Sequence, residues 1–204
     1  LGALTDLIDQ GKIRAWGSSN ETCWGVMKNL WEAEKHGLAR MASVQNNFSL
    51  INRRCESELA QVCRKEGVSL LPYSPLGGGV LTGKYTPGAK PAEGTRAGRG
   101  DKRINETEFR EESLQIAQTL KAHAEARGVT LAQFATAWVL AHQAVSSVIA
   151  GPRTLAQWQD YRPALDYRFT AEDEALVDAL VRPGHPSTPG YTDPAYPLDG
   201  RVRS

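Results

Sequence analysis

The chain has 204 residues, a length that suits one domain or slightly more. Its 24 basic and 23 acidic side chains give a net charge of +1, so no sequence-wide basic field favours nucleic-acid binding. A hydrophobic fraction of 41% is typical of a globular protein, and no apolar run reaches the roughly 18 residues that a membrane-spanning helix needs. Three cysteines without a CxxC spacing indicate reduced thiols and predict a cytoplasmic protein.

Short β-rich runs alternate with helical stretches, which is the pattern of βα units around a parallel sheet. The predicted strands cover residues 13–17, 41–45, 68–73 and 147–150. The predicted helices cover residues 1–10, 22–37, 56–65, 111–126, 130–142, 155–161 and 170–181. Five prolines and no periodicity predict an extended tail over residues 183–204.

Four parallel strands with helices between them fit two α/β architectures. One is an open sheet covered on both faces, and the other is the second half of a (β/α)8 barrel, which needs about 250 residues and eight strands. The chain opens with Leu1 inside the first predicted helix, so we expect further residues upstream. Residues 1–182 would form the domain, and residues 183–204 a Pro-rich C-terminal tail.

Polar, aromatic and glycine residues follow every predicted strand. In either architecture, ligands bind at the carboxyl ends of the strands. The alternative is that these are ordinary polar loops, but four in succession favour a binding site. The segments concerned are Ser18-Ser19-Asn20, Gln45-Asn46-Asn47, residues 73–79 and Gly151-Pro152-Arg153.

The glycine-rich loop after the third strand is the strongest of these signals. Residues 77–79 are three consecutive glycines, which allow close backbone approach to an anion, and Lys84 follows within reach. Residues 78–84 match part of a phosphate-binding loop, but Tyr85 replaces the Ser or Thr that binds magnesium. Turn residues follow instead of a helix, so the sequence excludes a P-loop nucleotide hydrolase.

Two further segments could bind an anion. Thr154 is positioned to cap a helix directly after Gly151 and Arg153, which forms either an anion site or an ordinary capped helix. Residues 88–103 carry five basic and two acidic side chains and form either a flap over a polyanionic cofactor or a solvated connection. The four histidines share no metal-ligand spacing, and no Ser/His/Asp arrangement is present.

Taken together, these segments resemble the aldo-keto reductases over about residues 1–181. Within that superfamily the chain is most similar to the bacterial branch that also resembles potassium-channel β-subunits. Tyr161 departs from the family pattern, which usually has Asn there. The matching segments are residues 11–14, 17–20, 45, 73–77, 82–85, 130–133, 137–138 and 149–157.

The resemblance implies strands 5–8 and their helices of a (β/α)8 TIM barrel, which binds NADP(H). Ser19, Asn20 and Gln45 would bind the nicotinamide carboxamide, and Tyr73 would stack on the ring. Arg153 would contact the 2′-phosphate. The remaining cofactor-binding positions implied by the resemblance are Ser74, Pro75, Leu76, Gly77, Gly79, Lys84, Arg96, Gly151, Gln157 and Asp160.

The implied reaction is hydride transfer between NADPH and an aldehyde or ketone, the small-molecule substrate. The family's catalytic Asp, Tyr, Lys and His would lie upstream of residue 1, so this chain alone is expected to be inactive and to carry no catalytic residue. The alternative is a non-catalytic NADP-binding or regulatory half-barrel module. If the chain is a truncated barrel, its open sheet edges favour self-association.

Overall fold

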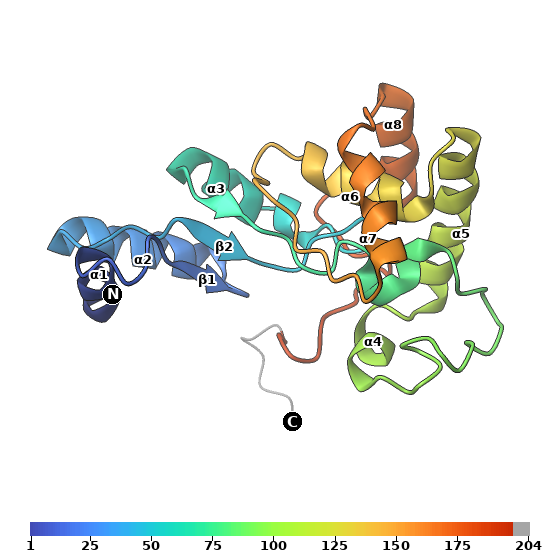
Figure 1. The fold of residues 1–204 in the computed structure, drawn as a ribbon, viewed down its shortest axis with the longest axis horizontal. Helices are drawn as coiled ribbons and strands as arrows, with labels where there is room; N and C mark the ends of the chain where they lie inside the picture. The colour runs from blue at the N-terminus through green and yellow to red at the C-terminus, as the bar shows by residue number, and fades with distance from the viewer. Residues whose placement is uncertain (198–204) are drawn as a thin grey trace.

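The computed structural model describes residues 1–197. Three strands form a parallel sheet in the order β1-β2-β3, namely β1 (Gly17–Ser19), β2 (Ser43–Gln45) and β3 (Ser69–Leu70). Helices α1 (Gly2–Asp9), α2 (Cys23–His36) and α3 (Leu59–Glu66) alternate with these strands along the chain. The predicted α/β alternation is therefore confirmed over this part of the chain, and Figure 1 shows α1, α2 and β1 extending away from the remaining helices.

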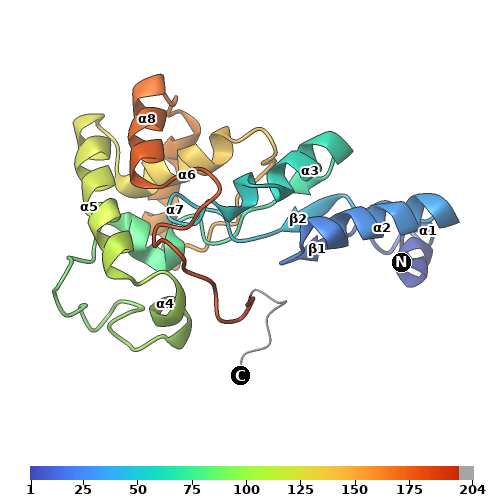
Figure 2. The same ribbon diagram turned by 180° about the vertical axis from the view of Figure 1, so that it is seen from behind.

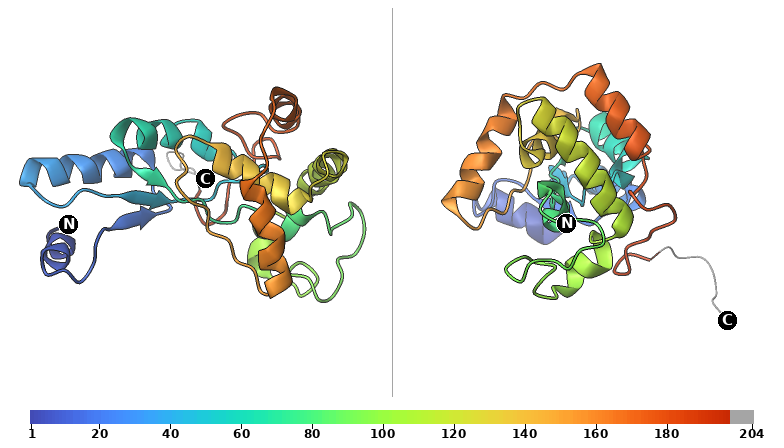
Figure 3. Two further views of the ribbon diagram at one scale, coloured as in Figure 1. Left: turned by 45° about the horizontal axis from the view of Figure 1, so that its top comes forward. Right: turned by 90° about the vertical axis from the view of Figure 1, so that its right-hand side faces the viewer.

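The other helices gather at the opposite end of the molecule (Figures 1 and 3). Helix α6 contacts both α5 and α7, so this group is packed together rather than strung along the chain. The group comprises α4 (Lys102–Thr107), α5 (Glu111–Ala126), α6 (Leu131–Ala141), α7 (Leu155–Tyr161) and α8 (Ala171–Leu180). Short 3₁₀ segments also occur at Arg54–Glu56, Gly77–Thr82 and Arg162–Leu165.

Local capping chemistry sets the helix boundaries. Four threonine hydroxyls each accept a hydrogen bond from the backbone N–H three residues further on, at 3.1 or 3.2 Å. Gly37 and Gly67 end α2 and α3 with φ of 62° and 67°, in the left-handed region that glycine adopts without strain. The predicted helices over 111–126 and 155–161 are confirmed at both ends. The capping threonines are Thr22, Thr130, Thr154 and Thr170.

The predicted fourth strand, 147–150, is not a strand in the structure. Val145 forms an isolated parallel bridge with Leu70, and Ile149 forms one with Tyr73. Val145 and Ile149 are four positions apart in the chain, but their partners Leu70 and Tyr73 are only three positions apart. This extra residue breaks the ladder as a bulge does, and Pro72 has no N–H to donate within it. The segment therefore lies beside β3 without forming a continuous ladder.

Two other segments also differ from the sequence prediction. Residues 102–107, within and just after the basic connection, form helix α4, which Asp101 caps by accepting from the N–H of Ile104 at 3.1 Å. The tail is extended but docked: Pro186 bridges Asn52, and Ser187 is buried. Figure 2 shows this segment running back from α8 past α5 towards α4. Positions 198–204 of the predicted tail lie outside the described residues.

The hydrophobic core lies between the sheet and the α5–α6 pair. Val44 and Leu70 of the strands are fully buried together with Phe48 and Phe134. Full burial of such side chains stabilises the fold by about 1.5–3 kcal/mol each. The core therefore holds the carboxyl ends of β1–β3 in fixed positions. None of the helices formed by residues 1–197 is both long and apolar enough to cross a membrane.

Candidate functional site

Hydrogen bonds join the carboxyl ends of the three strands. The N–H of Asn20 donates to the carbonyl of Gln45 at 2.9 Å, and the Ser19 hydroxyl donates to the same carbonyl at 3.2 Å. The Tyr73 hydroxyl donates to Asn20 Oδ1 at 2.7 Å. Asn20 has φ of 55°, a conformation that Asn tolerates better than most residues. The structure thus brings together four residues that the resemblance placed at one site.

A glycine cradle, residues 77–79, lies just beyond Tyr73. All three glycines have positive φ, and Ser74 precedes them with φ of 56°. A Cβ on Gly77 would lie 2.6 Å from Ile51 Cδ1, and one on Gly79 would lie 2.9 Å from Lys84 Nζ. Side chains are therefore excluded from the cradle, and the Lys84 ammonium lies directly against its backbone. The N–H groups of Gly77 and Gly79 donate within the turn, to the carbonyls of Ser74 and Leu76 at 2.8 and 2.9 Å, so the Lys84 ammonium is the group here that is suited to a phosphate.

Behind the cradle is a small cavity of about 60 Å³. Arg96 lines it and binds Asp101 through Nε at 3.1 Å and Nη2 at 3.0 Å. Arg103 lines it too and forms an ion pair with Asp193 of the tail. The full lining comprises Asn47, Tyr73, Ser74, Gly78, Arg96, Arg103, Ile104, Thr107 and Glu108.

The sequence predicted Asn47 and Arg103 only as members of the segments 45–47 and 88–103, and it gave no indication of Glu108. Asn47 was named as part of a strand end, but its partner Glu108 lies 61 positions away, and Asn47 Nδ2 donates to Glu108 Oε1 at 3.0 Å. Asp101 is of a residue type that commonly caps helices, so it could have indicated the start of α4. No local pattern indicates that the helix would turn Arg103 and Glu108 towards Tyr73.

The last predicted segment, Gly151 to Asp160, begins at the same edge because Ile149 bridges Tyr73. The N–H of Arg153 donates to Gln157 Oε1 at 2.6 Å, and both side chains are exposed. Asp160 instead accepts from Thr130 Oγ1 at 3.1 Å and Gln133 Nε2 at 2.9 Å. Its carboxylate therefore connects α7 to the start of α6.

The remaining predicted positions lie in the same loops. Pro75 is buried, and Leu76 is half-buried at the start of the cradle. Gly151 is exposed. Lys84 and Arg96 lie near the cradle, so the structure places the predicted residues along one edge, with Asp160 already held by another helix.

Tyr73 is not adapted to donate a proton at neutral pH. Burial, together with smaller contributions from Tyr196 and Asp193 and against the opposing charge of Arg103, raises the pKa of its hydroxyl to about 12. The hydroxyl therefore stays protonated and keeps its hydrogen bond to Asn20. An aromatic ring fixed in this way is suited to packing against a planar ligand.

Glu108 is almost completely buried, and burial raises the pKa of its carboxyl group. A group whose pKa is higher in the folded than in the unfolded protein stabilises the fold when it is protonated. This contribution of Glu108 is complete below the ordinary carboxyl pKa and is lost as the pH rises through the pKa of the folded protein. We therefore expect Glu108→Gln, which still accepts from Asn47, to be more stable than the wild type by on the order of 1 kcal/mol near pH 8. The difference should disappear near pH 4.

Urea unfolding of both proteins at the two pH values measures this difference. Glu106→Gln is the matched control on the same helix, because Glu106 is half-exposed and its pair with Lys102 is long, 3.7 Å. The control should change the unfolding free energy by less than about 0.5 kcal/mol at either pH. A Glu108→Gln effect that is the same at both pH values would contradict the expectation.

The chain is similar in sequence to proteins of a known family. The model of the "Aldo/keto reductase family" matches residues 1–182. Protein tas of Escherichia coli is 39% identical over 181 residues, which cover 88% of this chain and 51% of that protein. A probable voltage-gated potassium channel subunit beta of Arabidopsis thaliana is 32% identical over 165 residues, 80% of this chain and 50% of that protein.

A Bacillus subtilis protein, the uncharacterized oxidoreductase YrpG, is 31% identical over 190 residues, 93% of this chain and 54% of its own length. The chain therefore spans about half the length of these curated relatives.

Proposed function

The chain belongs to the aldo/keto reductase family, and from this premise we propose that it supplies the cofactor-binding side of an NADPH-dependent reductase of aldehydes or ketones. One observation carries the proposal: the glycine cradle and Lys84 lie next to an aromatic ring held at the carboxyl ends of three parallel strands. This edge is where ligands bind in α/β proteins.

In this proposal, Tyr73 packs against one face of the nicotinamide. Its bond to Asn20 Oδ1 fixes the ring in advance and leaves Asn20 Nδ2 as a donor for the carboxamide oxygen. Ser19 and Gln45 lie on the neighbouring strand ends and complete the polar surface around that amide. A preformed surface of this kind binds a ligand with less loss of conformational entropy.

The cradle would bind the pyrophosphate. The positive φ of residues 77–79 and the close approach of Ile51 to Gly77 favour glycine over larger residues, and the Lys84 ammonium lies close to Gly79. Ser74 and Leu76 lie at the start of the cradle, and Lys84 and Arg96 add positive charge. Arg153, which is exposed on the neighbouring loop, would pair with the 2′-phosphate and favour NADPH over NADH.

NADPH, when bound, supplies the hydride for reduction of a carbonyl carbon. The chain's own residues would bind and orient it, holding one ring face closed and the other open to the substrate. We place the proton donor outside this chain, because the high pKa of Tyr73 and its bond to Asn20 do not suit that role. The substrate-binding residues outside this chain would then decide which carbonyl compound reacts.

We expect Tyr73→Ala and Lys84→Met each to weaken NADPH binding by about tenfold or more, because a stacked ring and a phosphate contact each contribute on the order of 1–3 kcal/mol. Fluorescence titration of the purified chain and its variants measures the dissociation constants. Lys35→Met on α2 is the matched control, since that lysine is exposed and packs over Trp31 instead.

Two outcomes would refute the proposal: a folded chain that binds no NADPH, or variants that bind it as tightly as the wild type. If the chain binds NADPH saturably but reduces no tested aldehyde, two interpretations fit. The chain is either the cofactor-binding part of a reductase that needs further residues, or a regulatory NADP-binding module. Adding the upstream half of a relative separates the two, because only the reductase would gain activity.

A further inference from the structure

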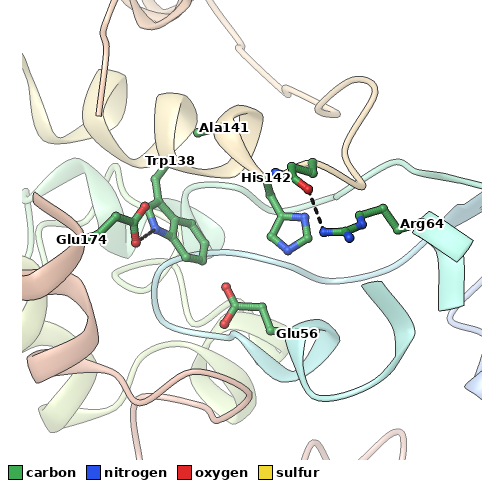
Figure 4. Close-up of a pocket in the computed structure, with 7 residues that line it drawn as sticks. Glu56, Arg64, Trp138, Ala141, His142 and Glu174 are labelled. Carbon is green, nitrogen blue, oxygen red and sulfur yellow. Dashed lines mark hydrogen bonds between the residues drawn. The ribbon is translucent and has the colours of Figure 1, made fainter. Parts of the chain in front are cut away.

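A larger cavity, of about 300 Å³, lies away from the strand ends. It is enclosed by the 3₁₀ turn Arg54–Glu56, helix α3, the C-terminal end of α6 and helix α8. Figure 4 shows its polar side chains facing a common space. The lining consists of Glu56, Arg64, Trp138, Ala141, His142, Gln143 and Glu174.

Glu174 provides an unneutralised negative charge at one end of this cavity. Its Oε2 accepts a hydrogen bond from Trp138 Nε1 at 3.4 Å, and within residues 1–197 it forms no ion pair. Burial raises the pKa of this carboxyl group, and the neighbouring Asp178 and Glu56 add to that effect, while the Trp138 hydrogen bond and the Arg53 charge oppose it. Glu56 differs, because its Oε2 accepts from Arg53 Nε at 2.8 Å and from the N–H of Gly184 at 3.3 Å.

Arg64 provides a positive charge at the other end. Its Nη1 donates to the neutral amide of Gln143 at 2.7 Å, and no carboxylate of the described residues pairs with it. In Figure 4, Glu174 and Arg64 lie at opposite ends of the cavity, with Trp138 and His142 between them.

The wall between the charges is rigid and offers one directed donor. The N–H of Ala144 donates to His142 Nδ1 at 3.2 Å, so a neutral ring carries its proton on Nε2. Burial lowers the pKa of His142, which favours that neutral form. Phe48 packs 5.1 Å from the Trp138 ring, and the Arg53 guanidinium lies 5.2 Å from it. The indole is therefore fixed with its N–H towards Glu174.

We propose that this cavity binds a small zwitterion whose ammonium and carboxylate groups are several atoms apart, of the ω-amino acid or short-peptide class. The ammonium pairs with Glu174, and the carboxylate pairs with Arg64. Where the ligand is a short peptide, His142 Nε2 can also donate to its amide oxygen. An α-amino acid is too short, since both of its charges are carried on one carbon. The volume suits a ligand of this size and excludes a dinucleotide.

The test uses the 204-residue chain and 6-aminohexanoate as the probe, with hexylamine and hexanoate as ligands that each lack one charge. Isothermal titration calorimetry should detect saturable binding of 6-aminohexanoate with a dissociation constant of about 1 mM or lower. Hexylamine and hexanoate should each bind at least about tenfold more weakly, because each lacks one of the two charge pairs. The indole N–H resonance of Trp138, absent in Trp138→Phe, should shift on binding because its acceptor Glu174 gains a cation.

Two variants give a second, independent test. Glu174→Gln and Arg64→Met should each weaken binding about tenfold or more. The matched controls are Glu172→Gln on the same helix, with a side chain that is 78% exposed, and the exposed Arg168→Met; both should bind like the wild type. The proposal is wrong if 6-aminohexanoate fails to saturate by about 10 mM, if hexylamine or hexanoate binds as well, or if both pocket variants bind normally.

Discussion

Replacing Asp173 with alanine is expected to lower the free energy of unfolding by about 3–5 kcal/mol. The carboxylate is fully buried at the start of α8. Its Oδ1 is 2.7 Å from His123 Nε2, and its Oδ2 accepts from the N–H and hydroxyl of Thr170 at 2.8 and 2.9 Å and from the Tyr167 hydroxyl at 3.1 Å. Alanine would leave the donors of this network without their shared acceptor and would remove half of the capping box.

The same change should become less costly in acid. Burial by itself would raise the pKa of Asp173, but the hydrogen bonds from His123 and Thr170 hold it below its ordinary value. A carboxylate with a lowered pKa stabilises the fold above its unfolded-state pKa, and that contribution is lost as the pH falls through the folded-state value. The difference between the two proteins should therefore shrink at acid pH.

Urea unfolding at neutral and acid pH measures both effects. Glu172→Ala is the neighbouring control, with an exposed carboxylate on Arg127, and should cost less than about 1 kcal/mol. Equal losses for Asp173→Ala and Glu172→Ala would show that the buried network contributes little to stability.

Replacing Arg53 with methionine is the second large effect that we expect, a loss of about 2–4 kcal/mol. Arg53 is 4% exposed, donates through Nε to Glu56 at 2.8 Å, and donates through Nη1 to Asp178 and the carbonyl of Val181, both at 2.7 Å. Methionine keeps most of the buried volume but leaves Glu56 unpaired. The loss is smaller than a fully buried pair would give, since Asp178 is half-exposed and can be hydrated again.

Thermal and urea unfolding measure this loss, and Arg40→Met is the control because Arg40 lies half-exposed near Glu66 at 3.6 Å. We expect the control to change stability by less than about 1 kcal/mol. The backbone N–H of Arg53 also donates to the carbonyl of His185 in the tail, at 3.0 Å. This bond does not depend on the side chain and would remain in the variant. An Arg53→Met protein as stable as the control would mean that α8 and the tail are held without this side chain.

These two residues belong to the scaffold behind the proposed NADPH site. Arg53 joins the turn after β2 to the end of α8, and the tail beyond α8 reaches Arg103 beside the cradle. The tail is thus connected both to the core and to the candidate site. We expect substitutions of Tyr73 or Lys84 to weaken NADPH binding more than substitutions of Asp173 or Arg53. The first two side chains would touch the cofactor, and the last two would not.

The sequence by itself determined the family and the helices apart from α4. The threonine caps at Thr130 and Thr170, and the terminating glycines Gly37 and Gly67, act within one turn of the chain, so they can be recognised without knowing the rest of the fold. The order of βα units and the glycine cradle are also local patterns. They were sufficient to predict the parallel order of three strands and the edge at which the predicted site residues lie, although the first predicted strand, 13–17, overlaps β1 only at Gly17.

Only the tertiary structure decided what distant segments do to one another. The one-residue mismatch between Leu70–Tyr73 and Val145–Ile149 removes the predicted fourth strand, although both segments are β-rich. Asp160 binds the cap of α6, and Glu174 and Arg64 face each other across a cavity. Ladder register, buried ion pairs and cavities depend on positions far apart in the chain, and no local pattern encodes those distances.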